Sequence, residues 1–495
     1  MEPVHMLTSH TPPHPPLPPA DARLVADLGV ALAPERVRCD PAELGLYGRD
    51  ASMIVGRAAV VCFPLSTDEV AAAVAACARH GRPFVARGSG TGLAGGATPV
   101  GGGGPVVIVT TKMNQILEVD AEQRLAWVQP GVLNLDLSRA VAHLGLHFAP
   151  DPSSQQSCSV GGNVANNSGG PHCLLYGVTN AHVLAVEVVL PDGRVALLGG
   201  PDPEPDGLDL RGAFVGSEGT MGIATRIAVR LTPLPPQVAT LLADFASMHD
   251  AARAVTAVIG AGVVPAALEM MDATIVEVVE AFVHAGFPTD AAAVLLVELD
   301  GQATGVEVQT AIVAEVLREH GARQVRVAAD ESQRAAWWKG RKSAFGAVAR
   351  IAPNYYLHDC VVPRTRLVEV LDEIARICAD RDLVLGNVFH AGDGNLHPLI
   401  VFDRRQPGVL ERVHAAGEAI IETCVRAGGS LSGEHGIWLE KRDAMPLVFS
   451  AEDLRAQNWL REAFDPAGLC NPQKVLPMGG SHCGDLAEVP VGAWI

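Results

Sequence analysis

The spacing of apolar and polar residues predicts alternating helices and strands in the first half of the chain. Between residues 21 and 32 the apolar side chains recur every three or four positions, which predicts a helix. An apolar run over 60–63 predicts a strand, and the capping residues at 66–69 then open a helix over the alanine-rich stretch 70–79. Further strands are expected over 84–86, 106–110, 116–119, 125–128, 183–190 and 225–231, with a helix over 133–144.

A proline-rich break, Thr232 to Pro236, separates this half from a second one with a different pattern. Beyond the break, apolar strand-like runs over 239–245, 294–300 and 324–328 alternate with helical patterns over 250–261, 303–319 and 365–379. This alternation is typical of an α+β domain. The sequence therefore predicts a domain boundary near residue 235.

The most unusual stretch of the first half is Arg87 to Ala97, with five glycines in eleven residues after a short apolar run. Glycine allows tight turns and close approach of the backbone to a ligand, and free backbone amides in such a loop can cradle a phosphate. Gly90 to Gly95 matches the dinucleotide fingerprint G-x-G-x-x-G, which requires a helix to follow. Because Thr98-Pro99, four glycines and a strand-like run follow instead, we reject a Rossmann fold. A phosphate-binding loop between two strands is the interpretation that remains.

Two more glycine-rich stretches follow, over 150–170 and 214–223. The first is long, polar and rich in small residues, and loops of this length are usually either functional or disordered. A flexible linker is one interpretation. Glycine pairs interleaved with Val160, Val164 and Ala165 favour the other, an ordered backbone close to a ligand.

In the second half, the stretch from Asn387 to His397 predicts a β-hairpin. Asp-Gly between apolar residues is a strong hairpin signal, so Asp393 and Gly394 are expected as the two turn residues. His390 and His397 would then stand opposite each other, with Cβ atoms about 5 Å apart. Two imidazoles in this position can share a metal ion or can be purely structural, and the pair alone does not decide between these.

The stretch from Gly428 to Gly436 places a carboxylate and an imidazole between glycines. Glu434 could complete a His/His/carboxylate set that leaves metal positions open for substrate. His435 would point elsewhere and be available as a base. The alternative is an ordinary turn whose charges are solvated.

A cationic stretch, Trp337 to Lys342, is the third candidate. Arg341 could clamp a carboxylate at two points, and Lys342 lies beside it, with Tyr355 and Tyr356 downstream. A solvated basic helix face over buried tryptophans explains the same residues equally well.

Composition narrows the function classes. The chain has 495 residues and a formal net charge of −18, which argues against nucleic-acid binding because that needs a basic face. Its ten cysteines contain no C-x-x-C pair, so no iron–sulfur or structural zinc motif is evident and a reducing compartment is indicated. The prolines of residues 1–20 suggest a disordered tail rather than a signal peptide, and no apolar run reaches the length of a membrane span. We expect a cytoplasmic protein, membrane-associated only if a partner docks it there.

Taken together, these stretches resemble the FAD-linked D-2-hydroxy-acid oxidoreductases of the vanillyl-alcohol-oxidase type. The resemblance runs from about residue 20 to 477 and is strongest to the D subunit of bacterial glycolate oxidase. D-lactate dehydrogenases and D-2-hydroxyglutarate dehydrogenases belong to the same family. The motifs that carry the likeness are Gly340-Arg-Lys-Ser-Ala-Phe, Pro353-Asn-Tyr-Tyr, Asn387 to His397, Ser432-Gly-Glu-His-Gly, Phe464-Asp-Pro and Asn471-Pro-Gln-Lys.

The resemblance implies an α+β fold of two main parts. A two-part FAD-binding domain of the p-cresol-methylhydroxylase (PCMH) type would span 21–235, and an α+β cap or substrate domain carrying the metal site would span 236–440. A C-terminal helical segment over 441–477 would return to the FAD, and 478–495 would form a second tail.

The resemblance also implies roles for individual residues. His390, His397 and Glu434 would hold one divalent metal (zinc, manganese or iron), with His435 as catalytic base and Arg341, Lys342 and Tyr356 binding substrate. FAD would be bound without a covalent link, because residues 87–97 contain no histidine. The FAD-binding residues would be Arg87, Gly88, Ser89, Gly90, Thr91, Gly92, Leu93, Gly95, Gly96, Pro150, Asp151, Ser157, Gly161, Gly162, Asn166, Ser168, Gly169, Gly170, Tyr176, Gly177, Glu218, Gly219, Gly222, Ile223 and Asn471.

The activity implied by the resemblance is oxidation of a short D-2-hydroxy acid, glycolate or D-lactate, to the 2-oxo acid, with hydride transfer to flavin N5. Electrons would pass to FAD-binding and iron–sulfur partner subunits, or to a quinone, a cytochrome or an electron-transfer flavoprotein. Three alternatives stay open: a metal-dependent hydrolase that uses the His/His/Glu set, a stand-alone D-2-hydroxyglutarate dehydrogenase, and a flavin-binding subunit needed only for assembly.

Overall fold

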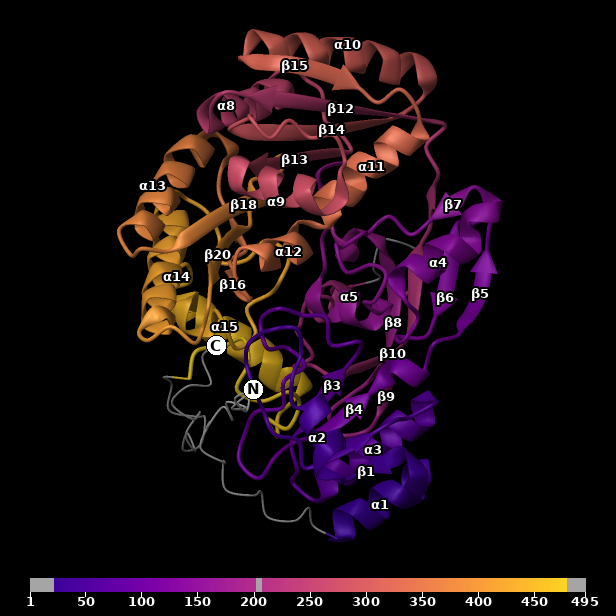
Figure 1. Cartoon of the computed structure of the whole chain (residues 1–495). Coiled ribbons are helices and arrows are strands. Elements are labelled where there is room, and N and C mark those ends of the chain that lie inside the picture. The colour runs from indigo at the N-terminus through magenta and orange to yellow at the C-terminus, as the bar shows by residue number, and fades with distance from the viewer. Residues whose placement is uncertain (1–21, 202–206, 479–495) are drawn as a thin grey trace, which may run out of the picture.

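The structure is a computed structural model that describes residues 22–201 and 207–478 (Figure 1). The tail expected over 1–20 and nearly all of the one expected over 478–495 lie outside the described residues. Two sheets build the N-terminal half. In the first, strands β2 (Val60–Cys62), β4 (Val106–Val109) and β3 (Phe84–Arg87) run parallel, and β1 (Val37–Arg38) pairs antiparallel with β2. Helices α1 (Ala22–Leu32) and α3 (Thr67–Arg79) pack on this sheet through a shared apolar cluster.

The local sequence explains where these elements begin and end. The Ser66 hydroxyl accepts from the backbone N–H of Glu69 and caps α3, as the sequence predicts. Residues 88–105, which follow β3, contain neither helix nor strand, so the rejection of a Rossmann fold is confirmed. The glycine loop therefore leaves the end of β3 without regular secondary structure.

The second sheet is antiparallel, in the order β5 (Ile116–Asp120), β6 (Leu125–Val128), β10 (Ile223–Arg230), β8 (Val183–Val189) and β9 (Val195–Gly199). The predicted strands over 116–119, 125–128, 183–190 and 225–231 are its members. Between β6 and β8 the chain forms α4 (Asn134–Val141), β7 (Leu146–His147), α5 (Val160–Asn166) and α6 (Cys173–Tyr176); elsewhere in this half lie α2 (Pro41–Tyr47), α7 (Leu210–Phe214) and β11 (Thr232–Pro233).

The cap half is built on one antiparallel sheet of nine strands, in the upper part of Figure 1. Its strands are β12 (Gln237–Phe245), β13 (Ala267–Asp272), β14 (Ala293–Gly301), β15 (Ala322–Val327), β16 (Asn354–Leu357), β17 (Cys360–Val361), β18 (Val384–His390), β19 (Asn395–Leu396) and β20 (Pro398–Phe402).

Helices cover both faces of this sheet, because side chains alternate between two apolar cores along its strands. One core receives α8 (Met248–Gly260), α10 (Ala303–Glu319), α13 (Leu367–Ala379) and α14 (Val409–Arg426). The other receives α9 (Ala273–Val283), α11 (Glu331–Lys342) and α12 (Ala344–Ala347). The site described below lies at the end of this sheet that faces the glycine loop.

The chain then returns to the N-terminal half after a short 3₁₀ helix, η7 (Arg442–Leu447), and α15 (Ala451–Phe464). The backbone of Cys470 forms an isolated parallel β-bridge with Phe84 of β3, and the Asn471 backbone N–H donates to the Phe84 carbonyl at 2.8 Å. The C-terminal segment is thereby fixed beside the glycine loop. Among the described residues no helix combines the length and apolarity that a membrane crossing requires.

Candidate active site

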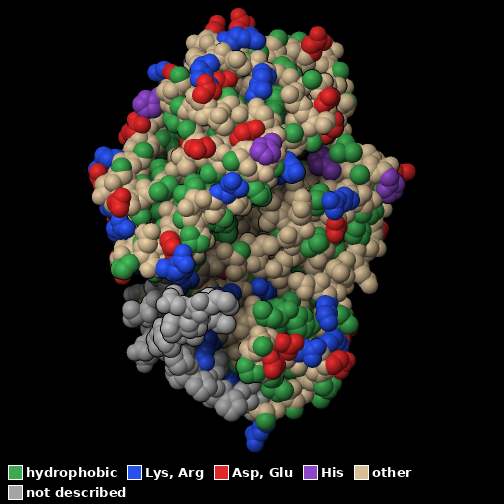
Figure 2. Space-filling model, in the orientation of Figure 1, with side chains coloured by type: hydrophobic (Ala, Val, Ile, Leu, Met, Phe, Trp, Pro, Cys, Tyr) green, Lys and Arg blue, Asp and Glu red, His purple; other side chains and the backbone are tan. Residues whose placement is uncertain are grey.

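A cavity of about 390 Å³ lies between the two halves of the molecule. One wall is the glycine loop together with residues 152–168, and the opposite wall comes from the cap half. Figure 2 shows the surface hollowed between the upper and lower parts of the molecule. A smaller cavity of about 60 Å³ continues under the glycine loop and reaches the third glycine-rich turn.

The glycine loop leaves no room for side chains at two positions. A Cβ on Gly88 would stand 2.4 Å from the Ser159 hydroxyl, and one on Gly96 would stand 2.6 Å from the Trp438 ring. At Gly92 a Cβ would meet only open space on the cavity side. The loop therefore offers bare backbone to the cavity, which fits the close approach that a pyrophosphate needs.

Buried side chains fix this loop to the C-terminal segment. The Lys474 ammonium donates to the carbonyls of Gly96 and Thr98 at 2.5 and 2.8 Å. Burial lowers the pKa of Lys474 to about 7. Burial raises the pKa of Glu218 to about 7, although the hydrogen bonds that its carboxylate accepts act to lower that pKa. Glu218 accepts from the backbone N–H of Ile437 and Trp438 at 2.7 and 2.6 Å. The third glycine-rich turn thus holds the loop that carries Glu434 and His435.

The cap wall of the cavity carries a cluster of potential metal ligands, His390, His397 and Glu434, one donor atom of each lying within 4.8 Å of the others. The Glu434 carboxylate lies 3.4 Å from His390 Nε2 and 3.5 Å from His397 Nε2. The two imidazoles are perpendicular, with centroids 5.1 Å apart.

The predicted register of the hairpin that carries the two histidines is wrong. His390 pairs with Asn395 rather than with His397, and the turn spans residues 391–394. Residues 395 and 397 lie on the same face of the strand, so His397 is the diagonal neighbour of His390. The histidines still meet because a shift of two residues preserves the face on which each side chain stands.

The donor set fits a divalent metal. His397 is 2% exposed, and neither ring nitrogen has a hydrogen-bond partner among the described residues. Leaving buried polar nitrogens unpaired is costly, and a metal ion would satisfy one of them. Two imidazoles and one carboxylate suit zinc, manganese or iron.

A carboxylate that the sequence analysis did not single out orients the first ligand. Glu269 belongs to β13, which pairs with β18. One oxygen of its carboxylate lies at hydrogen-bond distance, 2.8 Å, from His390 Nδ1, and the other lies 2.5 Å from the Arg341 guanidinium. Burial opposes ionisation, yet His390 and Arg341 keep the pKa of Glu269 below its ordinary value. A carboxylate behind a ligating histidine fixes its ring orientation. The available signal was Glu269 itself, the one charged residue within the apolar run 267–271.

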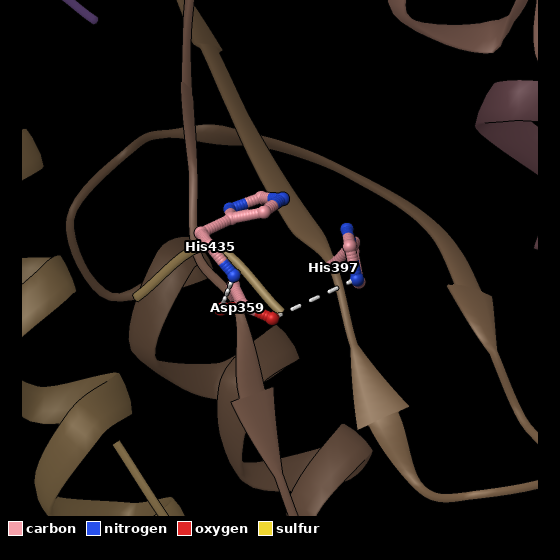
Figure 3. Close-up of side chains that lie close together, drawn as sticks. All are labelled: Asp359, His397 and His435. Atoms are coloured by element: carbon pink, nitrogen blue, oxygen red, sulfur yellow. Dashed lines mark hydrogen bonds and ion pairs between the residues drawn. The ribbon is translucent and has the colours of Figure 1, made fainter. Parts of the chain in front are cut away.

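Asp359 organises the loop that carries Glu434 and His435. Its carboxylate accepts from the backbone N–H groups of residues 433, 434 and 435 at 2.9–3.3 Å, and the Ser432 hydroxyl donates to it at 2.5 Å. Lys441 donates to it at 3.2 Å, and although burial opposes ionisation, this ammonium holds the pKa of Asp359 far below its usual range. Figure 3 shows Asp359 next to both His397 and His435, with a dashed line to His397.

Asp359, His397 and His435 form a second group with metal-ligand spacing, overlapping the first. Asp359 is fully buried and its oxygens are already occupied by the five donors named above. His435, whose ring lies 5.1 Å from that of His397, lines the cavity. We therefore assign Asp359 to loop support and keep His435 free for chemistry.

The predicted substrate-binding residues separate into two groups. Arg341 is 1% exposed and Lys342 lies beside it, and both line the cavity. Tyr356 does not: it lines an adjoining larger cavity, where its hydroxyl donates to Glu440 at 3.3 Å. Tyr355 lines both cavities, so the structure brings this neighbour, rather than Tyr356, to the site.

The predicted FAD-binding residues also separate. Those that line the main cavity are Gly88, Ser89, Gly90, Thr91, Gly92, Leu93, Gly96, Gly162, Asn166 and Ser168, and those that line only its small extension are Arg87, Gly161, Gly219, Gly222 and Ile223. The remainder line neither: Gly95, Pro150, Asp151, Ser157, Gly169, Gly170, Tyr176, Gly177, Glu218 and Asn471. Trp438 and Phe345 also line the main cavity; Phe345 ends the motif that begins at Gly340, but neither residue was predicted as part of the site.

Asp151 belongs to an ionic cluster between the two halves. His172 lies 2.8 Å from Asp151 and 3.2 Å from Glu298 of β14, and Lys342 lies 3.7 Å from Asp151. Burial opposes the charged imidazole, but Asp151 and Glu298 outweigh it and raise the pKa of His172 to about 10. The cluster joins the N-terminal half to the cap sheet next to Arg341.

Both halves match known family models, the FAD binding domain over residues 58–199 and the FAD linked oxidases, C-terminal domain, over residues 234–475. The chain is 47% identical over 421 residues to the glycolate oxidase subunit GlcD of Escherichia coli K12, which covers 85% of this chain and 84% of the relative. It is 40% identical to GlcD of Bacillus subtilis, over 84% of this chain and 88% of the relative. It is 33% identical to the D-lactate dehydrogenase of Anaerostipes hadrus, over 88% of this chain and 91% of the relative.

Solved structures agree on the fold. A p-cresol methylhydroxylase with substrate bound matches with a TM-score of 0.79 at 17% identity, covering 93% of this chain and 97% of the other. A 4-ethylphenol oxidase from Gulosibacter chungangensis matches with a TM-score of 0.76 at 20% identity, covering 92% and 97%. The predicted two-part FAD-binding domain with an α+β cap is thereby confirmed.

Proposed function

Because the chain belongs to the FAD-linked oxidoreductase family of glycolate oxidase subunits GlcD and D-lactate dehydrogenases, we propose that it oxidises a short D-2-hydroxy acid to the 2-oxo acid. Glycolate and D-lactate are the substrates that the relatives' names favour. The observation that carries the proposal is the cap wall of the cavity, where an arginine, a His/His/Glu set and a further histidine all face a loop of bare backbone.

Bound FAD would supply the acceptor for the hydride from C2, and a divalent metal held by His390, His397 and Glu434 would lower the pKa of the substrate hydroxyl. The glycine loop and residues 152–168 would hold the FAD, and the buried Lys474 keeps the glycine loop in place. Nothing near the loop suggests a covalent link, since residues 87–97 contain no histidine.

Arg341 is the group proposed to bind the substrate carboxylate. Its guanidinium is held by Glu269 from one side and faces the cavity from the other, so it is already oriented before substrate enters. Lys342 adds a second positive charge on the same wall. Since the net charge of the protein is −18, this local pair is what would select a small anion.

His435 is the proposed base that takes the proton of the substrate hydroxyl. Its ring lines the cavity and stands next to His397, while its backbone N–H is fixed by Asp359 at 2.9 Å. A base held on rigid backbone can stay within hydrogen-bond reach of a proton during the reaction.

Reduced flavin must pass its electrons on. Partner subunits, one of them an iron–sulfur protein, are proposed for a protein that works as a GlcD subunit, and a quinone, a cytochrome or an electron-transfer flavoprotein for one that works alone. Copurification of an iron–sulfur partner would favour the first arrangement.

Two variants test the assignment of roles. His435→Asn is expected to keep FAD and metal but to slow flavin reduction by substrate at least a hundredfold, because only the base is lost. His397→Ala is expected to lose the metal, measured by elemental analysis of the purified protein, while FAD content stays equal to that of the unmodified protein. Fast flavin reduction in His435→Asn would refute the role of His435, and full metal content in His397→Ala would refute the ligand set.

A further inference from the structure

The largest cavity among those described lies beside the flavin cavity rather than in it. It has a volume of about 630 Å³ and lies between α14, the strand β16, the glycine-loop residue Leu93 and the segment around η7. Leu93 and Tyr355 line both cavities, so the two spaces are separated by the thickness of one side chain. Nothing in the proposed oxidation of a hydroxy acid uses this second space.

Its walls exclude an anionic ligand. The described residues that line it include four carboxylates, Glu418, Glu422, Glu440 and Asp443, and neither lysine nor arginine. A second hydroxy acid, a nucleotide or a phosphate would be repelled there. Most of the other lining residues are aliphatic or aromatic, which favours an uncharged and largely apolar molecule.

The cavity also offers a hydrogen-bonding edge. The Tyr356 hydroxyl donates to Glu440, and His414 stacks near the Tyr356 ring at 6.4 Å between centroids. Burial raises the pKa of Glu440 to about 7, against the attraction of Lys441, so this carboxyl carries a proton in part of the molecules at neutral pH. A planar molecule with carbonyl oxygens would find an acidic proton and an aromatic face on the same wall.

The mouth of the cavity is apolar as well as acidic. Leu447, at the end of η7, lines the cavity and is 48% exposed, and its neighbour Val448 is 41% exposed but does not line it. An apolar entrance suits a molecule that arrives from an apolar phase or carries an apolar chain.

We propose that this cavity binds an uncharged aromatic electron acceptor of the quinone class. The proposal rests on the flavin function proposed above, because the electrons come from there. Conversion of a quinone to the quinol takes two electrons, released when the reduced flavin of the adjoining cavity is reoxidised, and two protons. Glu440 and Tyr356 on the cavity wall would supply these protons, and water at the exposed carboxylates Glu418, Glu422 and Asp443 would replace them.

The first test is equilibrium binding, which needs no turnover. A water-soluble short-chain benzoquinone is titrated into the oxidised holoenzyme and followed by calorimetry. One molecule is expected to bind per chain, and Leu447→Glu is expected to weaken binding at least tenfold by placing a charge at the apolar mouth. Val448→Glu is the matched control, since it adds the same charge one residue away, outside the cavity, and it should bind as the unmodified protein does.

A second variant fills the space itself. Ile421→Trp is expected to block binding, whereas Ala415→Trp, an exposed position on the same helix α14 that does not line the cavity, should not. Equal binding by Leu447→Glu, Ile421→Trp and the controls would overturn the proposal. Failure of the unmodified protein to bind the quinone, including a result in which it binds an alkylammonium ion instead, would overturn it too.

The second test separates this inference from the proposed function. The flavin is reduced photochemically without any hydroxy acid, and its reoxidation on mixing with the quinone is followed by absorbance. The rate is expected to saturate with quinone, and the half-saturating concentration should rise at least tenfold in Leu447→Glu only. If this holds while no hydroxy acid reduces the flavin, only the substrate assignment fails. A rate that rises linearly with quinone and is equal in both variants would overturn the quinone site.

Discussion

The ionic cluster between the two halves makes a prediction whose size follows from the structure. His172 of the N-terminal half is four-fifths buried and lies between Asp151 and Glu298, the latter on the cap strand β14. Replacing it by glutamine keeps a hydrogen-bonding side chain but removes the positive charge. Among the described residues, Asp151 would then keep only Lys342, 3.7 Å away, as a counter-charge, and Glu298 only Arg334, 3.3 Å away. Each buried carboxylate would lose one cationic partner, which is the costly way to break a buried ion pair.

The pKa of His172 gives the magnitude and the sign. Each pKa unit corresponds to about 1.4 kcal/mol, so the rise from 6.5 to about 10 limits the contribution to at most about 5 kcal/mol. Because the folded-state pKa is raised, the contribution is complete below pH 6.5 and is lost as the pH rises toward 10. We expect His172→Gln to lower the free energy of unfolding by about 3 kcal/mol at pH 6, with the deficit shrinking steadily through pH 9.5.

Urea unfolding of the holoenzyme at pH 6, 8 and 9.5 measures this difference. His249→Gln is the control, because His249 also pairs with an aspartate, Asp372, but on the exposed surface, where such pairs contribute about 0–1 kcal/mol. A deficit in His172→Gln that is the same at all three pH values would refute the electrostatic explanation and leave only a packing effect.

Three further predictions concern the site. Gly96→Ala places a Cβ 2.6 Å from the Trp438 ring, so the purified protein should lose most of its FAD absorbance. Gly92→Ala is the control and should lose much less, because a Cβ there meets nothing within 4 Å. Equal loss of FAD absorbance in the two variants would contradict the close-packing argument. Glu269→Gln should weaken metal retention about 10–100-fold in a chelator titration, because His390 loses its orienting carboxylate, and an unchanged chelator midpoint would contradict it. Arg341→Lys should raise KM for the hydroxy acid at least tenfold more than it lowers kcat, because a lysine cannot reproduce the two-point contact of the guanidinium. A variant that lowers kcat more than it raises KM would contradict the role of Arg341 in substrate binding.

Local patterns were enough to predict much of the fold. The apolar periodicity predicted most strands of the two N-terminal sheets, although not β1 or β9, and it predicted β12, β14 and β15 of the cap sheet. The proline-rich stretch Thr232 to Pro236 lies between β10, a strand of the second sheet, and β12, the first strand of the cap sheet along the chain. The glycine-rich loops were recognisable because bare backbone near a ligand leaves a compositional trace. The metal-ligand candidates were predictable because His390, His397 and Glu434 lie in short stretches with strong turn signals.

Long-range partners were not predictable in this way. Glu269, Asp359 and Trp438 reach the site from separate segments, and their roles arise only when β13, β17 and the 433–438 loop are packed together. The hairpin register differs from the predicted one because Asp393 and Gly394 are not the two central residues of a two-residue turn; the turn spans 391–394. Tyr356 and Tyr355 are adjacent in a strand and point to opposite faces, so a motif alone does not say which one enters the cavity.

The most direct test of the central claim is anaerobic reduction of the flavin in the purified holoenzyme. Glycolate, D-lactate, L-lactate and D-2-hydroxyglutarate are each mixed with the yellow protein, with and without prior chelation of the metal, and the loss of flavin absorbance is followed. We predict rapid bleaching by glycolate or D-lactate, little by L-lactate, and loss of bleaching after chelation that added divalent metal restores. A protein without flavin, or a flavin that none of these acids bleaches with metal present, would contradict the proposed function.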